Sequence, residues 1–200
     1  MSGTPSLFPA ETVSTAQAVE WFDLGAIGRA PARFDFAKLG NLNGHYIRET
    51  ENLRLARLIA PLVERALERD LSDTERERLT AAMPGLKPRA KTLVELADIA
   101  HFYVVPRPIP IDDKAKALLA PAKQLLGELA AMLRNATWQA AALEAAVRRF
   151  AEGRDLKLGA AAQPLRAALT GSTASPPIFE VMEVLGREEC VARLADASGG

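Results

Sequence analysis

Apolar residues recur at intervals of three and four along most of the chain, which is the period of an amphipathic α-helix. Serine, threonine or aspartate precedes several of these stretches, where a side-chain oxygen can cap the free N–H groups of the first turn. Ser72 and Glu75 have the spacing of a capping box. The pattern predicts helices over residues 14–22, 52–69, 92–100, 112–133, 137–151, 157–169, 178–185 and 188–195.

Two more helices are expected to begin at Asp35 and at Ser72. The second should stop at Met83-Pro84-Gly85, and Pro61 should kink or split the helix over 52–69, because proline removes a backbone donor. The helix after Asp35 is predicted to bury an apolar face of five side chains, namely Phe36, Leu39, Leu42, Tyr46 and Ile47.

Prolines 106, 108 and 110 occupy alternate positions, which forbids a helix and favours an extended, semi-rigid linker. We place a boundary there, between helical subdomains over 15–104 and 105–197. Residues 1–14 form a flexible lead and 198–200 a frayed tail in this interpretation.

Alanine and leucine dominate the composition, and aromatic residues make up only 6% of the chain. Strong helix formers with few aromatic residues predict an all-α fold built of two small helical subdomains in tandem. Twenty-five basic and 25 acidic residues leave no net charge, so the chain lacks the bulk attraction of a strongly basic nucleic-acid-binding protein. A local basic face remains compatible with a nucleic-acid partner.

No apolar run reaches the roughly 18–20 residues that span a bilayer, so a membrane protein is not expected. The first 20 residues show no secretory signal pattern. The single cysteine, Cys190, has no partner for an internal disulfide, which fits a reducing cytoplasm.

Residues that could carry chemistry are few and scattered. His45, His101 and Cys190 lie far apart, and no zinc-type spacing, phosphate-binding loop or nucleophile elbow occurs. The acid pairs at 112–113 and 188–189 stand at expected helix starts, where negative charge favours the helix itself. We therefore predict no catalytic residue, no metal site and no cofactor in this chain.

Basic residues gather in two places at loop–helix junctions. One group contains Lys87, Arg89 and Lys91, and the other contains Arg148, Arg149, Arg154 and Lys157. Each group is either a solvated surface or a phosphate-binding one, and the pattern alone does not choose between them.

Three stretches of the chain resemble bacterial class I glutamyl-tRNA synthetases, and they occur in the same order as in that family. They are FDFAKLGNLNGHYIRE (34–49), LKPRAKTLVELADIAHFYV (86–104) and KLGAAAQPLRAALTGSTASPPIFEVMEVLGRE (157–188). The resemblance covers roughly residues 15–197 and implies the C-terminal half that binds tRNA and reads its anticodon, with residues 15–104 as the connecting, stem-contact subdomain.

The resemblance also concerns what the chain lacks. The family's ATP-handling motifs, HIGH-like and KMSKS-like, have no counterpart here. The chain is therefore expected to have no ligase activity alone, whereas a full-length parent would be a glutamate–tRNA ligase that uses ATP and Mg²⁺. The implied partner is the anticodon stem-loop of glutamate tRNA, and we expect a cytoplasmic monomer that binds neither DNA nor a membrane.

Five positions are implied as the anticodon-binding site: Arg89, Arg166, Ser175, Pro176 and Ile178. Arg89 corresponds to an arginine that contacts the third anticodon base. Cytosine, which ends glutamate anticodons, offers two adjacent acceptors to a guanidinium, whereas guanine presents N–H donors and would repel it. Phe179 could stack on a base, although core packing is its expected role.

The five site residues are expected to line one continuous surface, because anticodon bases are neighbours along a strand. An alternative interpretation keeps the same fold but makes the chain a free-standing protein-interaction or regulatory domain.

Overall fold

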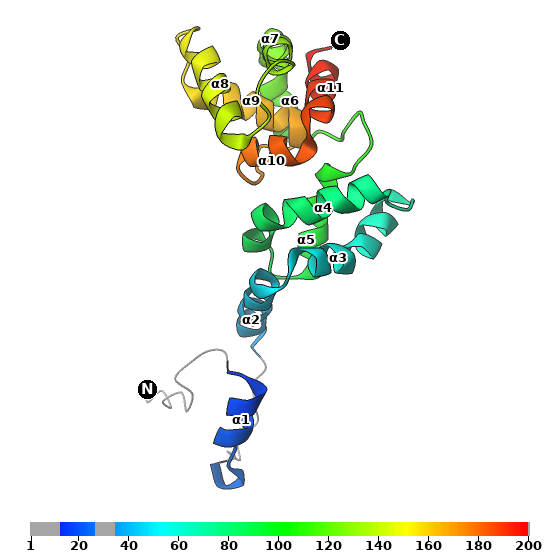
Figure 1. Ribbon diagram of the computed structural model, residues 1–200, viewed down its shortest axis with the longest axis vertical. Coiled ribbons are helices and arrows are strands. Elements are labelled where there is room, and N and C mark those ends of the chain that lie inside the picture. Colours follow the sequence, from blue (N-terminus) through cyan, green and yellow to red (C-terminus); the bar gives the residue numbers. More distant parts are fainter. Residues whose placement is uncertain (1–12, 27–34, 200) are drawn as a thin grey trace.

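The computed structural model of the protein describes residues 13–26 and 35–199, and every regular element in these ranges is a helix (Figure 1). The predicted all-α fold is therefore confirmed. Most of the lead predicted over residues 1–14, and Gly200 at the end of the predicted tail, lie outside the described residues.

The first part of the chain contains α1 (Thr15–Trp21), η1 (Leu24–Ala26), α2 (Phe36–Glu49), α3 (Asn52–Leu67), α4 (Asp73–Leu86), η2 (Lys87–Arg89), α5 (Leu93–Ala100) and η3 (His101–Tyr103). The second part contains α6 (Asp113–Leu119), η4 (Ala120–Ala122), α7 (Lys123–Leu133), α8 (Ala140–Glu152), α9 (Leu158–Thr170), α10 (Ile178–Leu185) and α11 (Arg187–Ser198). In Figure 1, α6–α11 form one end of the molecule, α3–α5 lie in the middle, and α2 and α1 extend toward the other end.

The expected helix starts are confirmed where a side chain caps the backbone. Ser14, Asp35, Ser72 and Thr92 each accept a hydrogen bond from an N–H of the first helical turn. Ser72 and Glu75 form the predicted capping box. These interactions act within three residues, so the local sequence is sufficient to place them.

One proline effect differs from the prediction, because α4 continues beyond Met83-Pro84-Gly85 through Leu86. Helix α3 runs unbroken across Pro61, so of the two predicted effects the split does not occur and the kink stays a prediction. In both helices, buried side chains on either side of the proline anchor the helix to the core, which outweighs one lost hydrogen bond. The single helix predicted over 112–133 is wrong, because it is broken into α6 and α7 by a 3-10 turn that contains Pro121.

The predicted burial of the α2 face is also wrong in part. Ile47 is 4% exposed, but Phe36, Leu39 and Tyr46 have between 46% and 79% of their surface exposed. Helix α2 packs on η2, and this contact covers only the Gly44–Ile47 side of the helix. The 3.6-residue period identified the helix and could not show which neighbour would cover it.

The buried apolar side chains form one continuous cluster that runs from Ile47 to Leu194 and so crosses the linker. Residues 105–112 contain no helix, as the alternate prolines predict. Helix α10 of the second part packs on α4 of the first, and a Cβ added to Gly85 of α4 would lie 3.3 Å from Cβ of Pro176. The two parts are thus in direct contact close to the start of α10.

The capping box of α4 predicts a stability change in acid. The hydrogen bond from Arg69, helped by those from Ser72, lowers the pKa of Glu75 from 4.5 to about 2 against the opposing effect of burial. A lowered pKa means that this carboxylate stabilises the fold above about pH 4.5, and that the stabilisation is lost as the pH falls toward about 2.

We expect Glu75→Gln to lower the free energy of unfolding by about 1–2 kcal/mol at neutral pH, allowing for the partial exposure of Arg69, and by much less at low pH. Urea denaturation at the two pH values measures the difference. Glu77→Gln, an exposed carboxyl on the same helix, is the control and should change neither value. An equal loss at both pH values would show that the charge of Glu75 does not matter.

Candidate nucleic-acid interface

The five predicted site residues lie on three neighbouring segments. Arg89 ends η2, Arg166 lies in α9, and Ser175, Pro176 and Ile178 connect α9 to α10. Burial lowers the pKa of Arg166, and the positive charge of Arg89 lowers it further, so the two guanidinium groups lie within electrostatic range of each other. The contact between Gly85 and Pro176 brings the end of α4, and with it η2, against the loop over 172–177.

Arg89 has an exposed side chain with no hydrogen-bond or ion-pair partner among the described residues. Its two basic neighbours are occupied. Lys87 donates to the carbonyl of Thr50 and to Asn52, and Lys91 donates to Asn41 with an Nζ–Oδ1 distance of 3.0 Å. These contacts hold η2 against α2 and the start of α3, and they leave Arg89 as the one basic group of the three that is free to bind a ligand.

Arg166 holds the loop over 172–177. Its Nη1 donates to the carbonyl oxygen of Pro176 at 2.9 Å, to that of Ser175 at 3.3 Å, and to the hydroxyl of Ser175. The same hydroxyl donates to the Pro176 carbonyl at 2.7 Å. Nε and Nη2 of Arg166 have no hydrogen-bond partner among the described residues. The guanidinium is thus anchored on one side and open on the other.

The apolar members of the predicted site are buried. Pro176 packs against Gly85, Ile178 is 3% exposed, and Phe179 packs against the core with partial exposure. The side chains of Pro176 and Ile178 therefore shape the loop, whose exposed residues are Ala174 and Pro177.

Sequence reasoning missed two residues beside the site, Tyr103 and Glu180. Burial raises the pKa of the Tyr103 hydroxyl, Glu180 raises it further, and Arg89 opposes them. Glu180 is exposed in the first turn of α10, with Oε2 3.8 Å from the Cβ position of Gly85. No local pattern marks either residue. The packing of α10 on α4 brings Glu180 to this region, and the contact of η3 with α4 places Tyr103 there.

The second basic group is mostly engaged within the protein. Arg148 pairs with Glu144, and Arg154 pairs with Glu128 and lies over the ring of Phe150 at 3.8 Å. Arg149 and Lys157 are the two members whose side chains have no partner within residues 13–26 and 35–199. Fewer basic side chains of this group are therefore available to a ligand than the sequence suggests.

Residues suited to covalent or metal chemistry are not assembled into a site. Burial raises the pKa of the Cys190 thiol to about 12, so it stays protonated at neutral pH. Within residues 13–26 and 35–199, no three His, Cys, Asp or Glu side chains are grouped so that they could hold a metal ion.

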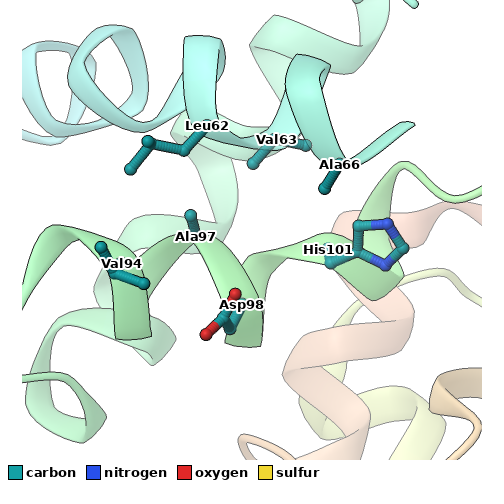
Figure 2. A pocket seen from close by; sticks show the side chains of 7 residues that line it. All are labelled: Leu62, Val63, Ala66, Val94, Ala97, Asp98 and His101. Carbon is teal, nitrogen blue, oxygen red and sulfur yellow. The ribbon is translucent and has the colours of Figure 1, made fainter. Parts of the chain in front are cut away.

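A pocket of about 390 Å³ lies between α3 and α5 (Figure 2). Its lining is apolar apart from Asp98 and His101, and in Figure 2 Asp98 lies between Val94 and His101. None of the five predicted site residues lines this pocket.

No helix in the described part of the chain combines the length and the apolar character needed to cross a lipid bilayer.

Comparison with known proteins identifies the type of domain. Residues 54–198 match a family model described as an anticodon binding domain. The chain is 60% identical over 189 residues to glutamate–tRNA ligase 2 of Rhodospirillum centenum, and 53% identical over 194 residues to glutamate–tRNA ligase 2 of Paramagnetospirillum magneticum. These alignments cover 94% and 95% of this chain and 40% of each relative. The chain thus spans about 40% of the length of the curated relatives it matches.

A solved structure shares the fold. A glutamate tRNA ligase from Elizabethkingia meningosepticum, crystallised in complex with its amino acid, superimposes with a TM-score of 0.80 at 25% identity. The superposition covers 94% of this chain and 37% of that protein.

Proposed function

Because the chain belongs to the anticodon-binding domain family, we propose that it binds glutamate tRNA and reads the anticodon, as a monomer and without making or breaking bonds. One observation carries the proposal: the family match over residues 54–198 includes all five residues of the candidate interface. The relatives at 60% and 53% identity bear the name of glutamate–tRNA ligases, which supports glutamate tRNA as the ligand.

The geometry supports a division of labour within the interface. Arg89 is exposed and has no hydrogen-bond or ion-pair partner among the residues that the structure describes, so its forked donors can meet the O2 and N3 acceptors of a cytosine. Arg166 keeps the loop over 172–177 in a fixed shape before the RNA arrives, and preorganisation of this kind lowers the entropic cost of binding. Ala174 and Pro177 are the exposed residues of that loop, so we expect their backbone groups to meet base edges.

We propose that charging of the tRNA takes place on a larger protein of which this type of chain forms the RNA-reading part. In that protein, ATP and Mg²⁺ would be used by another domain, and the residues described here would contribute recognition. None of the relatives reported above is named as an interaction or regulatory domain, so no specific observation favours that alternative.

The proposed role of Arg89 predicts a loss of discrimination. We expect Arg89→Gln to weaken binding of glutamate tRNA by about 1–3 kcal/mol, because a bidentate contact to one base is lost. Glutamine can also satisfy the donors of guanine, so a tRNA in which guanine replaces the third anticodon cytosine should be affected much less. Binding curves for both RNAs at two salt concentrations measure the ratio of affinities and its salt dependence.

Arg57→Gln is the matched control, since Arg57 is an exposed arginine on α3 that lies outside the predicted site and has no partner in the described part of the chain. An arginine that contacts only phosphate weakens both RNAs alike and lowers the salt slope by about one unit when removed. Equal weakening of the two RNAs by Arg89→Gln would demote Arg89 to such a contact. Failure of the parent chain to bind glutamate tRNA at low salt would contradict the proposed function itself.

A further inference from the structure

Three consecutive backbone carbonyls at the end of η3 are each held by a different arginine. Arg193 donates to Phe102 at 2.8 Å, Arg78 to Tyr103 at 3.1 Å, and Arg69 to Val104 at 3.0 Å. These carbonyls mark the point where the chain leaves the first part of the fold and enters the linker. The start of the linker is therefore held in place by arginine side chains as well as by the conformational restriction of the prolines.

Arg193 differs from the other two arginines because it comes from the other side of the linker. Arg69 follows α3 and Arg78 lies in α4, so both belong to the same part of the fold as the carbonyls. Arg193 lies in α11, and its Nη1 also donates to the carbonyl of Leu169 at 2.6 Å. Leu169 is in α9, three residues beyond Arg166. One guanidinium thus joins the end of η3 to the helix that carries Arg166.

The burial of Arg193 costs stability, so its hydrogen bonds to two parts of the fold are better explained by the positions that they fix. The residue is 2% exposed, and burial lowers the pKa of its guanidinium while the hydrogen bond from Nε to Glu189 at 2.6 Å opposes that shift. Its Nη2 is buried without a hydrogen-bond partner. Burying a charge and leaving a donor unpaired both cost stability, and an apolar side chain of similar size would avoid both costs. An apolar side chain could not hold two carbonyls from different parts of the fold.

A second set of contacts joins α11 to the linker. Glu189, which accepts from Arg193, also lies 3.7 Å from Nε of Arg107 in the linker, and Arg107 donates to Asp196 at 3.2 Å. These pairs are partly exposed, so they contribute little on their own. They show that α11 contacts both the start and the middle of the linker, with Arg193 as the buried member.

We infer that Arg193 is a positioning residue for anticodon reading: by holding the Phe102 and Leu169 carbonyls together, it sets the spacing between Arg89 and the loop held by Arg166. The inference rests on the proposed function, in which those two groups read neighbouring bases. Donors that distinguish bases must be held within about half an ångström of their required positions, so loss of the link should reduce discrimination more than affinity.

The spacing can be measured without RNA. Spin labels on Glu77→Cys in α4 and Ala145→Cys in α8 report the distance between the two parts of the fold, because both positions are exposed and the native Cys190 is buried and protonated. We expect one narrow distance distribution in the parent and a broader or shifted one in Arg193→Met. Arg187→Met is the matched control, since Arg187 also lies in α11 and donates to a carbonyl, that of Ala136, within the same part of the fold.

The same variants are then compared for binding to glutamate tRNA and to the RNA with guanine at the third anticodon position. Arg193→Met should lower the ratio of the two affinities by about tenfold, and Arg187→Met should leave that ratio unchanged. A variant that only destabilises the fold would lower the melting temperature, but the ratio of the two RNA affinities, measured well below that temperature, would not change.

A folded Arg193→Met variant with the parent's distance distribution and the parent's affinity ratio would overturn the inference. If Arg193→Met does not fold, Arg193→Lys replaces it, because lysine keeps the charge but lacks the fork that reaches two carbonyls. The same broadening and the same loss of ratio are expected for it, and their absence would equally overturn the inference. A parent chain that shows no preference between the RNAs would contradict the proposed function, and the distance measurement alone would then decide whether Arg193 sets the spacing.

Discussion

Gly171→Ala is expected to destabilise the protein by at least about 3 kcal/mol, the largest effect of any substitution considered for this fold. Gly171 caps the C-terminus of α9 with a φ of 73°, a left-handed conformation that costs an L-residue about 1–2 kcal/mol. A Cβ at this position would also overlap the carbonyl oxygen of Pro110 in the linker. That backbone cannot easily withdraw, because the N–H of Asp112 donates to the carbonyl of Gly171 at 2.9 Å.

Two other glycines separate the contributions. Gly199 caps α11 in the same left-handed region, with a φ of 87°, and the nearest atom to a Cβ there would be Nζ of Lys123 at 4.0 Å, so Gly199→Ala should show the conformational cost alone. Gly159 lies in the first turn of α9 with open space around it, and Gly159→Ala should be neutral or stabilising by up to about 1 kcal/mol. Urea denaturation of the three variants gives the comparison. A loss for Gly171→Ala no larger than that for Gly199→Ala would show that the close approach of the linker to α9 does not contribute.

Features of the fold that depend on a few neighbouring residues were predicted from the sequence. The capping side chains of Ser14, Asp35, Ser72 and Thr92 act on N–H groups within three residues, and the alternate prolines exclude a helix wherever the rest of the chain lies. The same local rule placed the end of α4 too early at Pro84, and Pro61 leaves α3 unbroken, because buried neighbours on both sides hold the two helices together.

The candidate site depends on contacts between distant parts of the chain, which explains why its residues and the role of Arg89 came from a resemblance and not from local patterns. Arg89 and Arg166 are 77 positions apart and approach each other only because α10 packs on α4. Whether a basic side chain is free depends on its partners in space. Lys87 and Lys91 bind α2 and its junction with α3, whereas Arg89 between them binds nothing within the described residues, and no spacing in the sequence distinguishes the three.

Arg166→Met is expected to weaken binding of glutamate tRNA by about 100-fold, or about 2.7 kcal/mol, and to do so equally for the RNA with guanine at the third anticodon position. The substitution removes every hydrogen bond that Nη1 makes to Ser175 and Pro176, while methionine keeps much of the packing of the arginine stem. The loop over 172–177 then has to be ordered by the RNA, and that entropic cost applies whichever base is being read. This pattern is the opposite of that expected for Arg89→Gln, which should alter the ratio of affinities.

Ser175→Ala separates two kinds of hydrogen bond that Arg166 donates to the loop, those to the carbonyls of Ser175 and Pro176 and the one to the Ser175 hydroxyl. It removes the hydroxyl but leaves both carbonyls as acceptors, so it should cost less than about 1 kcal/mol of binding. Arg166→Lys, which keeps one charged donor, should fall between the methionine variant and the parent. Protease cleavage within 172–177 should become faster in Arg166→Met and stay slow in Ser175→Ala, since only the former releases the loop.

Parent-like binding by Arg166→Met would mean that the loop keeps its shape without the guanidinium. A loss confined to the RNA with cytosine would instead make Arg166 a base-reading residue in its own right, acting through the Nε and Nη2 donors that remain free in the absence of RNA.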